Sequence, residues 1–200
     1  MAATRSYHHG DLRRAIVSAT LEVIRSDGVA AISLRDLARR AEVSHAAPAH
    51  HFKDKAGLLT AIATEGFELL ADTLAAVPAD AARRLREVGA RYVEFALNYP
   101  AHFEVMFRPD LLHGDDPELT AAKERASRAL YSGVEDLPAD RRGPDVQRTG
   151  LAAWSLAHGF ATLQLSGSLP PLDDDPAETF RKLVDDHPSQ RSYGRPPLEG

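Results

Sequence analysis

Three histidines lie close together in the first third of the sequence, beside residues that bind phosphate well. His45, His50 and His51 share this segment with Ser44 and Lys55. Imidazole nitrogens bind transition metals, and they also donate and accept hydrogen bonds with other ligands. No carboxylate or cysteine completes a metal-ligand set at the required spacing, so we expect no metal site. Contact with nucleic acid is the chemistry that these residues favour.

Short helices must present these residues, and the pattern around them predicts a helix-turn-helix. A first helix is expected over Asp11–Ser26, with Asp11 as its cap and one apolar face. Ser33 and Asp36 form a capping box at the start of a second, short helix. We expect Ser44 to cap a third helix over Ser44–Phe52, with Pro48 early in it. In such a pair the second helix enters the major groove, and the first crosses the phosphate backbone.

Composition and charge favour a DNA-binding head on a different kind of domain. The 200-residue chain has no cysteine, which excludes thiol catalysis and thiolate-bound zinc. Its formal net charge is −5, yet residues 1–60 carry nine Lys/Arg against six Asp/Glu, together with five of the nine histidines. No apolar run is long enough to span a membrane, and the start lacks a secretory pattern. We therefore expect a cytoplasmic protein with no membrane partner.

Helical periodicity also governs the rest of the chain, so the predicted fold is all-α. We expect a helix-turn-helix domain over residues 1–55 and a second helical domain over residues 56–186. The tail over residues 187–200 is rich in Pro, Gly, Ser and Arg and is expected to be disordered. Within the second domain, Val146–Ser166 is apolar on nearly all sides, which is typical of a buried or interface helix.

Several spaced motifs together resemble a known family. Ile32–Ala38, Val43–Pro48 and His51–Leu59 closely resemble the N-terminal domain of TetR-family transcriptional regulators. The segments Tyr7–Arg13 and Trp154–Gly159 look like the subgroup whose C-terminal domain is named for a Trp-His-Gly signature. The first resemblance covers Leu12 to about Ile62, and it implies a DNA-binding regulator of the bacterial cytosol.

The resemblance implies roles for particular residues of the helix-turn-helix. The residues that it assigns to DNA contact are Ser33, Arg35, Ser44, His45, Ala46, Ala49, His50, His51 and Lys55. His45 and Ala46 would stand over base edges, with His50 on the flank, and His51 matches the His of the family motif. Ser44, Ser33 and Arg35 are phosphate candidates. Lys55 resembles the family's phosphate-contacting lysine, at a helix start that favours an anion.

Ala49 departs from the family pattern. The family usually has an aromatic residue here, most often Tyr, which donates a hydrogen bond to a backbone phosphate. The absence of that hydrogen bond costs about 1–2 kcal/mol per half-site and leaves base readout largely intact. Ala49 therefore bears on affinity rather than on the class of function.

The resemblance also implies an effector pocket and a dimer interface in the second domain. Aromatic and other apolar residues recur there at helical spacing, which suits ordinary core packing and also an apolar pocket with a few polar groups. The pocket candidates are Tyr92, Phe95, Tyr99, Phe103, Met106, Phe107, Trp154 and His158. The helices Val146–Ser166 and Pro176–Asp186 resemble the family's dimer interface. Small residues allow close helix approach in it, namely Ala152, Ala153, Ala157, Gly159 and Ala161.

These observations predict a homodimeric transcriptional regulator, a repressor that a small-molecule effector releases from a palindromic double-stranded DNA operator. An alternative is a TetR-like fold with weakened DNA binding that acts through a ligand or a protein partner, for which Ala49 is the support. A third reading, an all-α enzyme, lacks a nucleophile–base pair, a phosphate loop and a metal set. We expect no cofactor, no metal and no catalytic residue.

Overall fold

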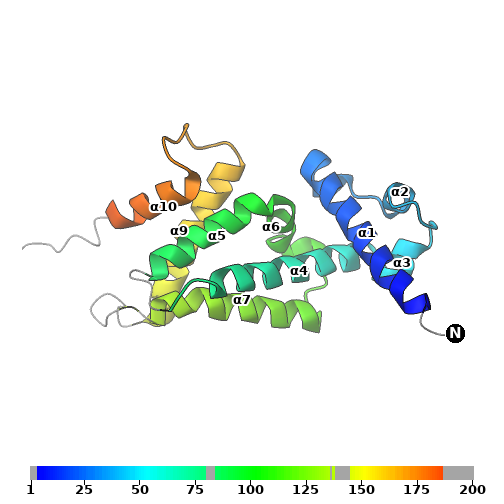
Figure 1. Cartoon of the computed structure of the whole chain (residues 1–200), viewed down its shortest axis with the longest axis horizontal. Helices are drawn as coiled ribbons and strands as arrows, with labels where there is room; N and C mark the ends of the chain where they lie inside the picture. Colours follow the sequence, from blue (N-terminus) through cyan, green and yellow to red (C-terminus); the bar gives the residue numbers. More distant parts are fainter. Residues whose placement is uncertain (1–3, 80–83, 136, 138–144, 187–200) are drawn as a thin grey trace, which may run out of the picture. The chain divides into compact units, whose positions relative to one another are not determined.

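The computed structural model describes residues 4–79, 84–135, 137 and 145–186 (Figure 1). These residues contain helices and no strand, so the all-α prediction is confirmed. The elements are α1 (Thr4–Asp27), η1 (Val29–Ala31), α2 (Leu34–Arg40), α3 (Ala47–Phe52), α4 (Lys55–Ala75), α5 (Arg84–Asn98), α6 (Pro100–Met106), η2 (Pro109–Leu111), α7 (Pro117–Glu135), α9 (Val146–Leu165) and α10 (Pro176–Asp186). No helix in these ranges is both long and apolar enough to cross a membrane. The predicted disordered tail lies outside the described residues.

The chain forms two compact units. The first combines Met1–Ala76 with Phe95–Ala129, and the second combines Val77–Glu94 with Leu130–Gly200. Helices α5 and α7 therefore each contribute residues to both units. These units do not divide the chain at residue 55, and the boundary that the sequence predicts there stays a prediction.

Helix α1 is longer than the sequence predicts. It begins at Thr4, so Asp11 lies inside the helix and cannot be its N-cap. No proline precedes Asp11 in this segment, and the single Gly10 costs only about 1 kcal/mol relative to Ala, which is too little to stop a helix. The apolar face is as expected, because Ile16, Val23 and their neighbours at helical spacing are buried.

The capping prediction holds for α2 and fails for α3. The Ser33 side chain accepts a hydrogen bond from the Asp36 N–H at 3.5 Å, as the capping box requires. Helix α3 instead begins at Ala47 after Ala46, without a side-chain cap. Ser44 precedes it with a turn in which the Ser44 carbonyl accepts from the Ala47 N–H at 2.9 Å. Pro48 accounts for the later start, because its fixed φ suits the first turn of a helix.

The junction between α3 and α4 is tight. Lys53 has a φ of +65°, a left-handed conformation that is rare for a residue with a Cβ. Asp54 then caps α4 by accepting the Gly57 N–H at 2.7 Å. A Cβ on Gly57 would lie 2.0 Å from the Phe52 carbonyl oxygen, so this approach requires glycine.

Helix α6 packs on α4 and α1 within the first unit. A Cβ on Gly66 of α4 would lie 2.6 Å from the Met106 Sδ, so the two helices meet closely at a glycine. Glu104 accepts the Val29 N–H at 3.2 Å and so connects α6 to η1, between α1 and α2. His102 is buried in the same contact, and its Nε2 lies 3.7 Å from a Glu65 carboxylate oxygen.

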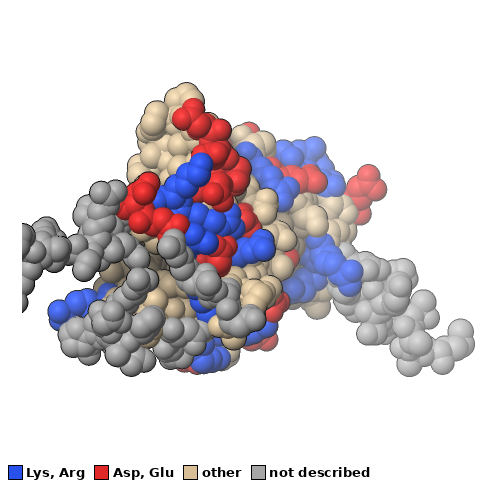
Figure 2. Space-filling view, turned by 60° about the vertical axis from the view of Figure 1, so that its left-hand side comes forward, with Lys and Arg blue, Asp and Glu red and all other residues tan. Residues whose placement is uncertain are grey.

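In the second unit, aromatic packing and a charge network join α5, α9 and α10. The Phe160 and Phe180 rings meet edge to face at 5.7 Å. The half-buried Arg181 of α10 pairs with Glu87 at 2.9 Å and Glu94 at 3.4 Å on α5. Arg86 on α5 pairs in return with Asp185 at 2.7 Å. Figure 2, in which this side of the molecule comes forward, shows basic and acidic side chains side by side.

Candidate nucleic-acid interface

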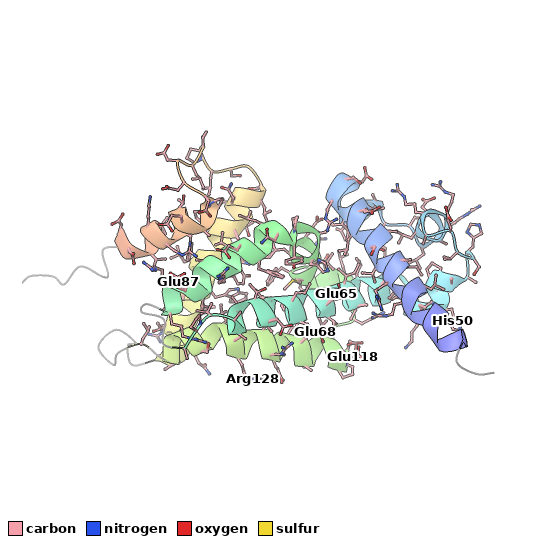
Figure 3. The ribbon with its side chains drawn as sticks, viewed as in Figure 1. His50, Glu65, Glu68, Glu87, Glu118 and Arg128 are labelled. Atoms are coloured by element: carbon pink, nitrogen blue, oxygen red, sulfur yellow. The ribbon has the colours of Figure 1, made fainter. Side chains whose placement is uncertain are left out.

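The recognition-helix candidates form one outward face. Exposed residues at and before α3 are Ser44, His45, Ala46, Ala49 and His50. Pro48 and Phe52 are buried on the opposite side and hold the helix in place. Figure 3 labels His50 on this helix, at the α1–α3 end of the chain. An exposed helical face of imidazoles and methyl groups has the shape and the chemistry to meet base edges in a major groove.

His51 differs from this exposed set. It is half-buried, and its ring lies 5.5 Å from the His50 ring and 6.3 Å from the Phe52 ring. The DNA contact that the family motif implies for His51 stays a prediction. The guanidinium of Arg13 lies 5.5 Å above the Phe52 ring and braces α1 against α3.

Three of the phosphate candidates, Ser33, Arg35 and Lys55, lie at helix starts, and Ser33 and Lys55 already make intramolecular hydrogen bonds. The Ser33 hydroxyl accepts from the Asp36 N–H, and a hydroxyl can still donate to a second group. Arg35 follows at the exposed first turn of α2. Lys55, the first residue of α4, donates to the Ala30 carbonyl at 3.4 Å, so a phosphate would have to share or replace that bond. Arg39 and Arg40 add exposed positive charge at the end of α2.

A contact that sequence reasoning missed holds the start of α4. The His113 Nε2 lies 3.0 Å from the Asp54 Oδ1, and the His113 backbone N–H donates to the Thr60 Oγ1 at 2.9 Å. The Gly57 N–H, followed by the His113 side chain, holds the pKa of Asp54 below its usual range. Asp54 is therefore a carboxylate beside Lys55 at neutral pH. No sequence signal pointed to His113, because it is 59 positions from Asp54.

The predicted effector residues fall into two groups. Phe95, Tyr99, Phe103, Met106 and Phe107 belong to the first unit. There the Phe95–Tyr99 and Phe103–Phe107 ring pairs lie 5.3 Å and 5.0 Å apart. Close packing of this kind fits the ordinary core role that the sequence also allowed. Whether these residues bind an effector stays a prediction.

Tyr92, Trp154 and His158 come together in the second unit. The Trp154 Nε1–H donates to the Tyr92 hydroxyl at 3.2 Å, and that hydroxyl lies 2.9 Å from the His158 Nδ1. Burial raises the pKa of the Tyr92 hydroxyl and lowers the pKa of His158. Both groups are therefore neutral at neutral pH, and the hydroxyl can donate to the imidazole while it accepts from the indole.

The outer surface of α9 and α10 carries large apolar side chains that are exposed. The large hydrophobic side chains that are exposed in the described part of the chain are Leu151, Leu156, Leu163, Leu165 and Leu183. All five belong to these two helices.

The small residues of α9 do not all share this surface. Ala152 is exposed, and Gly159 has open space where a Cβ would be. Ala157 and Ala161 are buried in their own unit, so the expectation that they permit approach of another helix at the surface is wrong for these two. Helical spacing gives which residues share a face, but only the packing shows which face is covered.

Within the described ranges, no group of three or more His, Asp and Glu side chains could hold a metal ion.

Two family models match this chain, one in its N-terminal part and one in its C-terminal part. Residues 16–62 match the family described as bacterial regulatory proteins, tetR family, and residues 85–187 match the tetracyclin repressor-like C-terminal domain. The transcriptional regulator BetI of Escherichia coli K12 is 30% identical over 185 residues, covering 88% of this chain and 93% of BetI. The Trp-His-Gly subgroup stays a prediction.

Solved structures show the same fold. A protein of unknown function from Rhodococcus sp. RHA1 has a TM-score of 0.73 and 33% identity, covering 90% of this chain and 94% of that chain. AibR, solved with isovaleryl coenzyme A and operator DNA, has a TM-score of 0.66 and 17% identity, covering 86% of this chain and 95% of that chain.

Proposed function

The chain belongs to the TetR family of transcriptional regulators, and from this we propose that it is a homodimeric repressor that a small-molecule effector releases from a palindromic operator. DNA binding and transcriptional regulation are properties of the family, whose members are transcription factors rather than enzymes. The dimer, the effector and the direction of regulation are the proposal.

The outward face of α3 carries the proposal for DNA recognition. Ala49 and His50 are exposed on one side of α3, whose other side is buried, and His45 and Ala46 are exposed in the turn just before it. Alanine methyl groups can contact thymine methyl groups, and imidazole nitrogens can pair with the acceptors of purines. Arg35 and Lys55 would bind the flanking phosphates and fix the register without reading sequence.

The exposed leucines of α9 and α10 support the dimer. Leu156 and Leu163 lie two turns apart on one face of α9 and are both exposed, so they offer an apolar surface that a second copy would remove from water. A symmetric pair of recognition helices can meet successive major grooves about 34–36 Å apart, which matches a palindromic operator.

Contacts of α6 support a route from effector to DNA. Glu104 holds the Val29 N–H beside the helix-turn-helix, and Met106 packs against Gly66 of α4. A ligand that prefers another position of α6 would therefore act on η1, which precedes α2, and on α4, which begins with Lys55. AibR is a fold relative that was solved with both a small molecule and operator DNA.

The first test is a selection of random duplexes on the purified protein, followed by binding of the selected duplex across a salt series. We expect a palindromic site and a steep loss of affinity with salt. His50→Ala should change the selected sequence, whereas Arg128→Ala, at an exposed position on α7, should not. Weak binding without enrichment would contradict the proposal. Recovery in Ala49→Tyr would then assign the weakness to the missing aromatic.

The dimer has its own test. Leu163 is 46% exposed on α9, and Leu163→Asp places a charge that the interface would have to bury. We expect the variant to be monomeric by light scattering at concentrations where the wild type is dimeric. Ala121→Asp adds the same charge at an exposed position on α7 and should leave the dimer intact. A monomeric wild type, or a dimer unaffected by Leu163→Asp, would refute this interface.

A further inference from the structure

A polar hollow of about 190 Å³ lies in the first unit, beside the end of the recognition helix. Gly57, Thr60, Ala61 and Thr64 form its floor on one face of α4. The hollow shares no residue with the predicted effector pocket. It is therefore distinct from that pocket, although His51, one of the residues assigned to DNA contact, also lines it.

The two sides of this hollow carry opposite charge. Arg13 of α1 and Lys53 at the end of α3 line one side, and Asp116 and Glu118 at the start of α7 line the other. Figure 3 labels Glu118 at that end of α7. In the described part of the chain, Arg13, Lys53 and Glu118 make no ion pair within 4.0 Å. Both sides thus have charge available for a ligand.

Fixed contacts hold both sides in place. The His113 N–H donates to the Thr60 Oγ1, and the His113 ring bonds to Asp54, which attaches the loop before α7 to α4. Asp116 accepts the Leu119 N–H at 2.9 Å and so caps α7. On the other side, Arg13 is fixed over Phe52. These contacts hold the backbone of both sides in place, whereas the exposed side chains of Lys53 and Glu118 become ordered when a ligand binds.

We propose that this hollow is a second small-molecule site and that it takes a zwitterion, an aliphatic amino acid whose carboxylate and ammonium are separated by a short chain. The carboxylate pairs with Lys53 and Arg13, and the ammonium pairs with Glu118. The threonine hydroxyls of the floor supply hydrogen bonds between the two charges. A ligand with one charge leaves the opposite side unpaired and binds more weakly.

The site has a consequence for regulation that rests on the proposed function. Lys53 joins α3 to α4 in a left-handed conformation, and a ligand held between Lys53 and α7 would restrict the motion of that junction. Binding itself is measured without DNA, so its failure would not bear on operator recognition.

The test titrates the full-length protein with glycine, β-alanine, γ-aminobutyrate and ε-aminocaproate, each beside the carboxylic acid and the amine of equal chain length. Amide shifts of Gly57, Thr60 and Thr64 report occupancy of the hollow. We expect one chain length to bind at least about tenfold tighter than both of its singly charged counterparts. No shift at these amides with any amino acid, or equal binding of zwitterion and single ions, would overturn the proposal.

Two variants identify the charges that act. Glu118→Gln should weaken the zwitterion about tenfold and leave it no better than the matching carboxylate. Lys53→Gln should also weaken the zwitterion, while Arg13 keeps part of its preference over the matching amine. Glu124→Gln, at an exposed position on α7 outside the hollow, is the control and should bind as the wild type does. Wild-type binding by Glu118→Gln and Lys53→Gln, both with wild-type circular dichroism, would refute the site.

Discussion

Replacement of Tyr92 by Phe tests the buried hydrogen bonds of the second unit. Tyr92 is 1% exposed, and its hydroxyl accepts from Trp154 and lies within hydrogen-bond distance of His158. The ring of Phe fills the same space, so the substitution removes the oxygen without opening a cavity. Any loss of stability therefore reports on these hydrogen bonds rather than on packing.

The magnitude follows from the number of bonds removed. A typical intramolecular hydrogen bond contributes about 1 kcal/mol net, so two bonds set an upper value of about 2 kcal/mol. The buried hydroxyl of the wild type also carries a desolvation cost that Phe avoids, which lowers the expected loss. We predict that Tyr92→Phe reduces the free energy of unfolding by about 1–2 kcal/mol.

The assay is urea denaturation at one fixed protein concentration, because association would shift the apparent stability. Trp154 is the single tryptophan of the chain, so its fluorescence reports on this cluster directly. The midpoint should fall while the slope stays constant. Tyr99→Phe is the matched control, because in the described part of the chain the Tyr99 hydroxyl makes no hydrogen bond. Equal effects of the two substitutions, or no change in Tyr92→Phe, would refute the reasoning.

Three further predictions concern other parts of the molecule. Lys55→Ala should weaken operator binding. The slope of log affinity against log salt concentration should fall by about 0.9 for each phosphate that the protein no longer neutralises. An unchanged slope would count against a phosphate role for Lys55. Gly57→Ala should lower the melting temperature of the protein, because its Cβ would lie 2.0 Å from a backbone oxygen. Gly159→Ala is the control and should leave the melting temperature unchanged, because nothing lies within 4 Å of the added Cβ. Equal melting temperatures of the two variants would contradict the steric argument. Burial raises the pKa of Glu87, but the hydrogen bonds and charges of Arg181 and Arg86 lower it by more, so the pKa in the folded protein lies below the ordinary value of 4.5. Its contribution to stability is present above that value and is lost as the pH falls through the lowered pKa, so Arg181→Gln should flatten the acid dependence of the urea midpoint. If the urea midpoints of the wild type and of Arg181→Gln fall in parallel as the pH is lowered, this role of the ion pair is contradicted.

The sequence was sufficient for features that depend on neighbours within a few residues. The Ser33–Asp36 cap, the helical periodicity and the early Pro48 of α3 are all local, and the structure agrees with them. The exposed face of α3 also follows from spacing, because Pro48 and Phe52 lie one turn apart on its buried side.

Two local predictions failed, and the reason is also local. Weak signals compete at helix ends, where a cap residue such as Asp11 or Ser44 contributes about 1 kcal/mol. A glycine before Asp11 did not stop α1, and the proline after Ser44 set the start of α3. Boundaries are therefore less determined by sequence than the existence of the helices.

Tertiary structure alone decided the contacts that connect the functional parts. Glu104 meets the Val29 N–H across 75 positions, Tyr92 meets His158 across 66, and His113 meets Asp54 across 59. Nothing in the local sequence favours one such partner over another, because each pair forms only after the hydrophobic faces of the helices have packed. The sequence thus determined which helices form and which face of each is apolar, whereas packing determined which polar side chains meet between them.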